Sequence, residues 1–144
     1  MPKESNREFG DTWSYPYFSV CTTSTHDMSG IRAWWEEDHD RSQRFFNKIL
    51  HQSGEAPYFA EPWICDKILQ LQLDSPSILC IIPLQDWLSF DGDLRRKMPS
   101  EEQINEPANP NHYWRYRMHI SIEELMRQTS FNNALLMKIK KSGR

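Results

Sequence analysis

The sequence predicts an α/β protein organised as one crossover unit of a parallel sheet. Two strand-like runs, 17–23 and 77–82, consist largely of aromatic, β-branched and aliphatic residues, which suit a pleated and buried setting. Between them lie segments whose apolar residues recur at helical spacing. Since parallel strands require a long and usually helical connection, the order strand, helices, strand indicates two parallel neighbours.

Three helices are expected in this connection. The first spans about 29–38, the second about 41–51 and the third 62–73. Pro62 can occupy the first turn of the third helix, and a turn sequence ends that helix. The second strand, 77–82, is an almost continuous apolar run, which is typical of a strand buried on both faces.

Polar or irregular segments flank this unit. Residues 1–16 are expected to form a polar loop that leads into the first strand, and a short helix is expected to start near Pro83. The segment 89–111 is rich in Gly, Pro, Asn and charged residues, with room for one helical turn. A loop of this length in a compact protein is usually functional. A capping box at 121–124 predicts the start of the next helix, and Ser130 is expected to cap the last one.

Composition limits the possible partners. The formal net charge is −3 and the isoelectric point is about 5.9, so no basic surface favours a nucleic acid. No apolar run approaches the roughly 20 residues that cross a bilayer, so no membrane is expected as a partner. The basic residues of the C-terminus are expected to form only a solvated end, and they are Lys138, Lys140, Lys141 and Arg144.

Cysteine usage and the N-terminal sequence indicate a cytosolic protein. Cys21, Cys65 and Cys80 are scattered and odd in number, a pattern that favours reduced thiols over disulfides or structural zinc. Residues 1–8 are too polar for a secretory signal, and their early acidic residues are unlike an organelle transit peptide.

A His-Asp pair stands out after the first strand. His26 and Asp27 follow a run of small hydroxyl residues and precede the first helix, and the carboxyl end of a strand is where α/β folds usually place chemistry. A second interpretation is that the pair merely caps the helix, because Asp is a common capping residue. Spacing alone leaves both interpretations open.

Two other chemistries do not fit the sequence. A hydrolase triad of Ser24, His26 and Asp27 fails because neighbours on a strand point to opposite faces, and no G-x-S-x-G turn exists. A metal site built from His26, His39 and His51 has no known ligand spacing. Neither a metal nor another cofactor is therefore expected.

Three motifs, in a fixed order, give the sequence a family resemblance. They are the His-Asp stretch 22–38, the segment Ile82-Pro83-Leu84-Gln85-Asp86, and the segment 104–117, which holds Asn105-Glu106-Pro107 and Trp114-Arg115. Together they resemble the 4-α-glucanotransferases, the amylomaltase or disproportionating-enzyme family (glycoside hydrolase family 77), and its plant cytosolic members in particular. The resemblance runs from about Met1 almost to Arg144.

The resemblance implies that 17–144 form the C-terminal portion of a (β/α)8 TIM barrel, with about its last two strands and their helices. The chain of 144 residues cannot hold a whole barrel, which needs about 200 residues or more. The implied reaction transfers glucosyl or glucan units between α-1,4-glucans with retention, in starch or maltose metabolism. The implied partners are an α-1,4-glucan, maltose or a heteroglycan, and no cofactor is implied because carboxyl groups suffice.

The resemblance also assigns roles to single residues. Asp27 is expected to be catalytic as the transition-state stabiliser, while His26 and Asn105 are expected to bind substrate. Independently of the resemblance, Trp34 and Trp35 are adjacent on a predicted helix, so at most one can face the barrel squarely, and core packing is expected for both. A supporting position behind the sugar contacts is expected for Gln85, Asp86, Trp114 and Arg115. The alternatives are that Asp86 caps the helix it begins and that Trp114 and Arg115 are only structural.

The family's nucleophilic Asp and acid/base Glu belong to motifs that this sequence lacks. We therefore expect a fragment that is inactive by itself and, because its sheet edges are unpaired, poorly stable or oligomeric. The alternative is a non-catalytic carbohydrate-binding or interaction protein derived from a truncated gene.

Overall fold

A parallel pair of short strands lies at the centre of the computed structural model, which describes residues 7–144. The strands are β1 (Val20–Cys21) and β2 (Leu79–Cys80), with Val20 opposite Leu79. A backbone bond from the Ile81 N–H to the Cys21 carbonyl, at 2.9 Å, extends the pairing. The α/β class and the parallel crossover are confirmed, although both strands are shorter than predicted.

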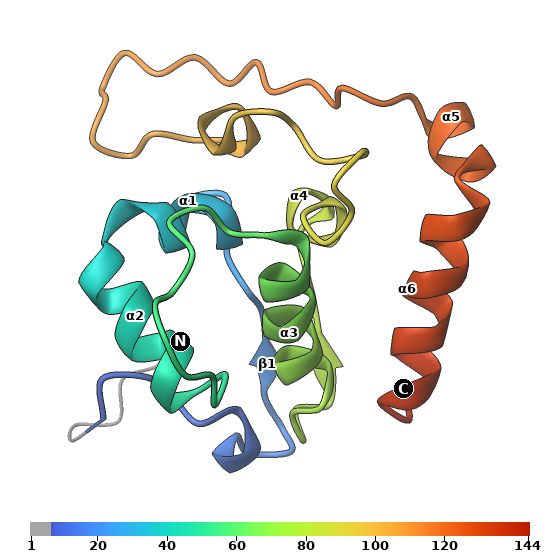
Figure 1. Ribbon diagram of the computed structural model, residues 1–144. Coiled ribbons are helices and arrows are strands. Elements are labelled where there is room, and N and C mark those ends of the chain that lie inside the picture. The colour runs from blue at the N-terminus through green and yellow to red at the C-terminus, as the bar shows by residue number, and fades with distance from the viewer. Residues whose placement is uncertain (1–6) are drawn as a thin grey trace.

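The crossover consists of three helices. In Figure 1, α3 lies against the strands, and α1 and α2 stand beside it. The predicted bounds of the third helix are confirmed, because Pro62 occupies its first turn, where a missing N–H costs nothing. The helices are α1 (Ile31–Glu37), α2 (His39–Lys48) and α3 (Pro62–Leu73).

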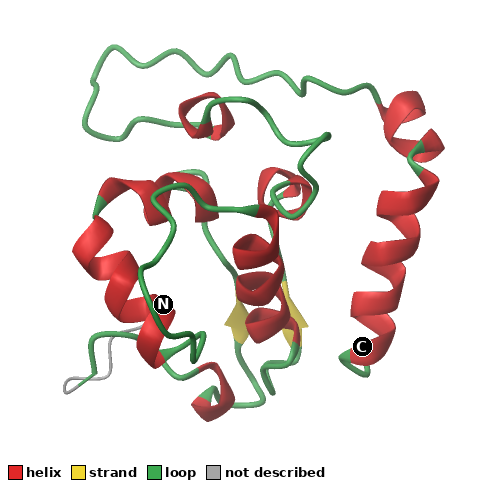
Figure 2. Ribbon diagram, viewed as in Figure 1, coloured by secondary structure: helices red, strands yellow, loops and turns green. Residues whose placement is uncertain are grey.

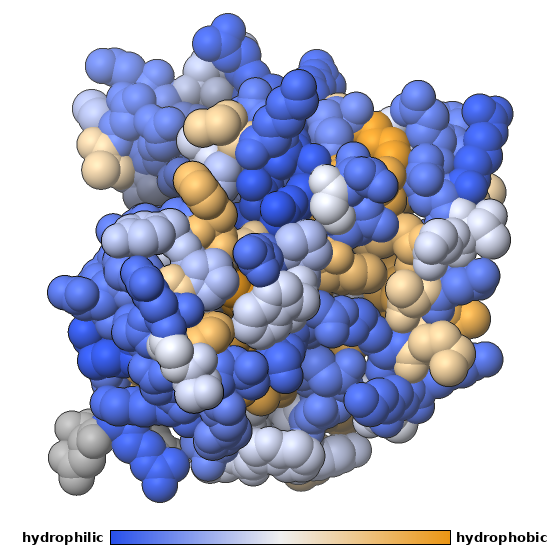
Figure 3. Space-filling view, viewed as in Figure 1, coloured by the Kyte–Doolittle hydropathy of each residue, from blue (hydrophilic) through white to orange (hydrophobic). Residues whose placement is uncertain are grey.

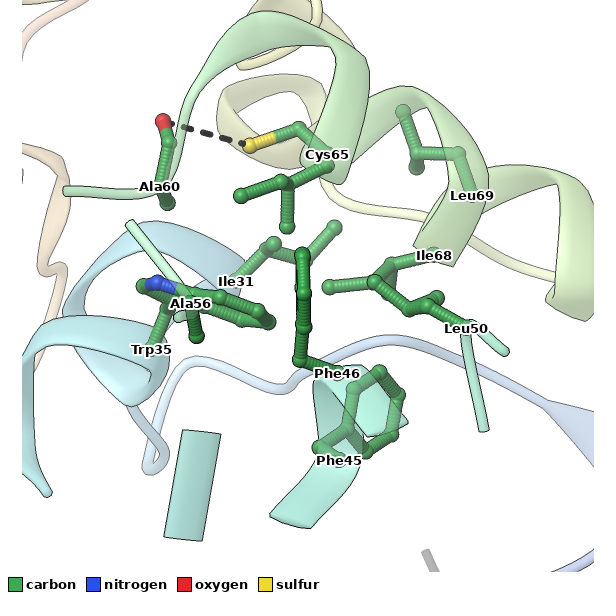
Figure 4. Packing of buried hydrophobic residues seen from close by; sticks show 11 residues of the cluster. Ile31, Trp35, Phe45, Phe46, Leu50, Ala56, Ala60, Cys65, Ile68 and Leu69 are labelled. Atoms are coloured by element: carbon green, nitrogen blue, oxygen red, sulfur yellow. Dashed lines mark hydrogen bonds between the residues drawn. The ribbon is translucent and has the colours of Figure 1, made fainter. Parts of the chain in front are cut away.

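The hydrophobic core lies between these three helices (Figure 4). Trp35 is 1% exposed, and its indole N–H donates to the Pro57 carbonyl at 2.8 Å. Trp34 is partly buried, and its ring meets that of Phe45 edge to face at 5.2 Å. The prediction that both tryptophans pack in the core is confirmed.

The two faces of the strand pair differ. On the face toward α3, the Cys21 thiol donates to the Gln72 carbonyl at 3.4 Å. On the other face, Val20 is 56% exposed and Leu79 is 52% exposed. The prediction of a second strand buried on both faces is therefore wrong, because no other described element covers this face.

A long irregular segment joins the strand pair to two C-terminal helices (Figure 2). The capping box of α5 is confirmed, with Ser121 and Glu124 bonded to each other's backbone N–H groups. The last helix starts at Thr129 without a side-chain cap, so Ser130 does not cap it. The remaining elements are η1 (Thr12–Ser14), α4 (Leu84–Leu88), η2 (Pro99–Glu102), α5 (Ile122–Arg127) and α6 (Thr129–Lys141).

The C-terminal helix is attached to the rest of the molecule. Phe131 is buried and stacks on Phe90, with ring centroids 5.1 Å apart, and Figure 3 shows hydrophobic side chains beside the C-terminal helices. Lys138 pairs with Asp66, and Arg144 donates to the Ser75 carbonyl at 2.6 Å. The C-terminus is therefore more than the solvated basic end that composition predicts.

Within residues 7–144, none of the helices combines the length and the apolar character that a bilayer span requires. The predicted polar loop 1–16 falls partly outside the described residues, since only 7–16 of it are described. Within that part the chain forms the single turn η1.

Candidate functional site

The two parallel strands bring two of the sequence motifs to one edge of the sheet. The loop after β1 carries His26 and Asp27, and the short α4 after β2 carries Gln85 and Asp86. Parallel strands end on the same side, so both motifs lie at the carboxyl edge of the pair. This edge is the candidate site.

Asp86 holds the loop after β1 in place. The hydroxyls of Thr23 and Ser24 donate to Asp86 Oδ2 at 2.5 and 2.7 Å. The backbone N–H of Ile31 donates to Asp86 Oδ1 at 2.9 Å. Because the Asp86 side chain is only 1% exposed, one buried carboxyl group fixes both ends of the loop that contains the His-Asp pair.

These bonds exclude the capping interpretation of the His-Asp pair. The N-cap of α1 is Gly30, without a side-chain cap, and the first helical N–H goes to Asp86. Asp27 therefore does not cap the helix. A Cβ at Gly30 would lie 2.9 Å from Asp86 Oδ1, so the close approach of loop and carboxyl group requires glycine.

Asp27 binds a residue from the distant loop. The side-chain amide of Asn105 donates to Asp27 Oδ1 at 2.6 Å, and His26 Nε2 lies 3.3 Å from Asp27 Oδ2. The side chains of His26 and Asp27 are each about half exposed, at 54% and 52%. The three residues with predicted contacts to substrate thus form one open cluster of polar groups.

An indole ring adjoins this cluster. The centroid of the Trp114 ring lies 5.4 Å from that of His26 and 6.2 Å from that of His112. His112 is itself bonded through Nε2 to the Ile104 carbonyl at 3.1 Å. Trp114 is 61% exposed.

Gln85 and Arg115, which are expected behind the sugar contacts, make different kinds of contact. The Arg115 guanidinium stacks over the ring of Tyr113 at 5.4 Å. The Gln85 amide donates to the Glu102 carbonyl at 3.5 Å, so it supports the loop that carries Asn105. Arg115 has no such link to His26 or Asp27 among the described interactions.

A buried ion pair ties the long loop to α1. Arg32 Nη1 lies 2.5 Å from Glu102 Oε1, and both side chains are more than nine-tenths buried. Arg32 also donates to the carbonyls of Arg96 and Lys97 at 2.6 and 3.1 Å. Burial raises the pKa of Glu102, although the neighbouring Arg32 acts in the opposite direction.

Sequence reasoning missed Arg32, Glu102 and His112. Burial of a charged residue on α1 was foreseeable, because Arg32 stands between apolar helix positions, but its partner is 70 residues away. No local signal identifies Glu102 or His112. Among residues 7–144, no three His, Cys, Asp or Glu side chains gather as metal ligands.

The family described as 4-alpha-glucanotransferase (glycoside hydrolase family 77) matches residues 1–123. The chain belongs to this family. The resemblance noted in its motifs is confirmed, and the His-Asp pair, Asp86 and Asn105 all lie inside the matched region.

Curated relatives carry the same family description. The chain is 38% identical over 144 residues to the 4-alpha-glucanotransferase DPE2 of Oryza sativa subsp. japonica, covering 100% of this chain and 15% of the relative. It is 32% identical over 135 residues to the 4-alpha-glucanotransferase of Chlamydia trachomatis serovar D, covering 92% of this chain and 25% of the relative. It is 34% identical over 130 residues to the 4-alpha-glucanotransferase of Chlamydia pneumoniae, covering 90% of this chain and 24% of the relative. The chain thus spans a quarter or less of these relatives.

Proposed function

We propose that this chain supplies part of the sugar-binding and transition-state-stabilising side of a 4-alpha-glucanotransferase site. The intact site would transfer glucosyl or glucan units from one α-1,4-glucan to another with retention. The single observation that carries the proposal is the Asn105–Asp27–His26 cluster, held at the carboxyl edge of two parallel strands.

The cluster fits the recognition of sugar hydroxyls. An amide, an imidazole and a carboxyl group together offer both donors and acceptors. The Asn105 bond orients the Asp27 carboxyl group from one side, and its half-exposed remainder faces solvent. A preorganised acidic group near the sugar ring stabilises the positive charge that develops as the oxocarbenium ion forms.

In this scheme Asp27 would stabilise the developing positive charge of the sugar. The nucleophile and the acid/base would be other residues. A retaining transfer needs a nucleophile and an acid/base about 5–5.5 Å apart. Neither residue that contacts the Asp27 carboxyl group is itself a carboxylic acid. We place the nucleophile and the acid/base on polypeptide other than these 144 residues, in keeping with the 15% and 25% coverage of the relatives.

The fold proposed for the complete site is a (β/α)8 barrel, of which 17–144 form the C-terminal part. Three features support it: the parallel crossover, the helix α3 on one face of the strands, and the exposed apolar face opposite. In such barrels the inner face is apolar and catalytic residues stand at the carboxyl ends of strands. His26 and Asp27 follow that rule.

A cytosolic location is part of the proposal, as are roles in starch or maltose metabolism. The cytosolic location is supported by the three cysteines, which are all free thiols, as is usual in a reducing compartment. Burial raises the pKa of the Cys65 thiol to about 11, so this thiol is neutral and unreactive at physiological pH.

A chimera tests the proposed function. In the rice relative, the segment that matches this chain would be replaced by residues 1–144, and maltotriose disproportionation would be measured. We expect the chimera to transfer glucosyl units and Asp27→Asn to lower kcat about 10²–10³-fold, the usual loss for one preorganised electrostatic group, while the thermal midpoint stays nearly constant.

The matched control is Asp93→Asn, which changes an exposed loop residue and should retain full activity. Near-normal transfer by the Asp27→Asn chimera would remove Asp27 from the site. An inactive but folded chimera that still binds maltotriose would favour the alternative function, a non-catalytic carbohydrate-binding protein.

A further inference from the structure

Resting on the proposed function, we infer that Trp114 forms an aromatic platform on which one glucosyl ring stacks, beside the Asp27–Asn105 pair. The inference depends on where the indole lies, how it is held and how much of it faces solvent. Together they favour direct contact with the sugar over the supporting or structural role that the sequence predicts for Trp114.

Trp114 is held in place by two imidazoles. His26 and His112 lie against its ring at centroid distances of 5.4 and 6.2 Å, with interplanar angles of 52° and 73°. The bond from His112 to the Ile104 carbonyl fixes the second imidazole to the loop itself. The indole is therefore oriented by its neighbours, as a binding surface must be if it is to avoid an entropic cost on ligand binding.

The exposed area of Trp114 is large despite these neighbours. Trp114 is 61% exposed, whereas Trp35 in the core is 1% exposed. An indole has a broad apolar face whose transfer out of water is favourable. A pyranose ring offers a matching C–H face on one side and hydroxyls around its rim.

The hydroxyl-binding groups lie directly beside this platform. His26 contacts Trp114 on one side and Asp27 on the other, at 3.3 Å between Nε2 and Oδ2. Asn105 adds an amide to the same carboxyl group. A glucosyl ring on the indole would therefore have donors and acceptors within reach of its rim, which selects a sugar over an ordinary apolar ligand.

The test is maltotriose binding to the 144-residue chain, followed by the indole N–H resonances of the ¹⁵N-labelled protein and by calorimetry. We expect the Trp114 resonance to shift, and Trp114→Ala to weaken binding roughly five- to tenfold, the usual worth of one aromatic contact. Trp114→Phe retains an aromatic face and should stay within about threefold of the parent.

Trp13→Ala is the matched control, since Trp13 is 67% exposed on η1 and should leave affinity unchanged. Circular dichroism verifies that each variant is folded. If Asp27→Asn weakens binding and Trp114→Ala does not, the platform is disproved while the proposed function stands. If the parent chain binds no maltotriose, the platform is disproved as well, and the chimera's transfer activity still decides the proposed function separately.

Discussion

Asp86 decides the conformation of the candidate site, although its own side chain is buried. It accepts bonds from Thr23, Ser24 and the backbone of Ile31. The His-Asp pair lies between these donors in the chain, so the position of Asp27 depends on a residue in the other strand's motif. A carboxyl group with two oxygens suits this position because three donors converge on it.

Asp86→Ala should destabilise the chain by roughly 3 kcal/mol, because three buried or partly buried donors lose their acceptor. Urea unfolding measures this loss, and the resonances of His26 and Asp27 should move as their loop is released. The exposed Asp93→Asn serves as control. A loss below about 0.5 kcal/mol, which is typical of surface substitutions, would show that Asp86 does not hold the loop.

The sequence predicts the identity of the site residues better than their contacts. His26, Asp27 and Asn105 are identified from their motifs, and the structure brings them together. The partners of Asp86 lie 55 to 63 residues away in the chain, and no local pattern encodes such pairs. The predicted alternative that Asp86 caps its own helix is wrong, since the N-cap of α4 is Pro83 without a side-chain cap.

Among the elements, α1 and the turn η2 form the main anchor of the long loop. The buried Arg32–Glu102 pair joins them, and Arg32 also holds two loop carbonyls. Glu102, the partner on η2, lies three residues before Asn105 in the chain. The loop that carries Asn105 and Trp114 is therefore attached to the same helix that follows the His-Asp pair.

Arg32→Met should cost about 3–5 kcal/mol, as expected when one partner of a buried ion pair is removed. Because burial already raises the pKa of Glu102, this carboxyl group holds its proton more tightly in the folded than in the unfolded chain, and protonation therefore contributes to stability. That contribution is present at low pH and is lost as pH rises through the raised pKa. Without Arg32 to oppose the shift, we expect a smaller loss at pH 5 than at pH 8, measured by urea unfolding.

The exposed Arg127→Met on α5 is the control for this substitution. An equal loss of stability for Arg32→Met at pH 5 and pH 8 would show that the ionisation of Glu102 does not determine the loss.

Helix bounds are predicted best where the end signals are chemical and local. The third helix matches because a proline starts it and a turn sequence stops it, and the capping box of α5 depends only on Ser121 and Glu124. Strand burial is predicted poorly. An apolar run indicates that its residues suit a covered surface, whereas Leu79 is 52% exposed because no described element packs on its face.

At the scale of the whole molecule, residues 7–144 expose an apolar sheet face and the two outer edges of the strand pair. Val20 and Leu79 are paired in register on this face, and Phe18 and Ile81, two residues away, are also exposed. Apolar surfaces and unpaired edges of this kind favour association. The expectation of a poorly stable or oligomeric chain stays a prediction.

Sedimentation velocity over a range of concentrations tests it. We expect the sedimentation coefficient of the chain to rise with concentration, and Leu79→Lys to weaken the association about tenfold or more, because a charge must then be desolvated at the contact. Met126→Lys, on the exposed side of α5, is the control. Concentration-independent monomers, or an equal effect of Met126→Lys, would contradict the assignment of association to this face.

The hydrogen bond between Asp27 and Asn105 joins residues that are 78 positions apart. Closing so large a loop costs entropy that must be offset by the elements in between, which include the crossover helices and β2. The cluster can therefore assemble only after the crossover has folded, late in the folding of the chain. By the same reasoning, this hydrogen bond should break first when the fold loosens, so sugar recognition should disappear on heating before the core between α1, α2 and α3 melts.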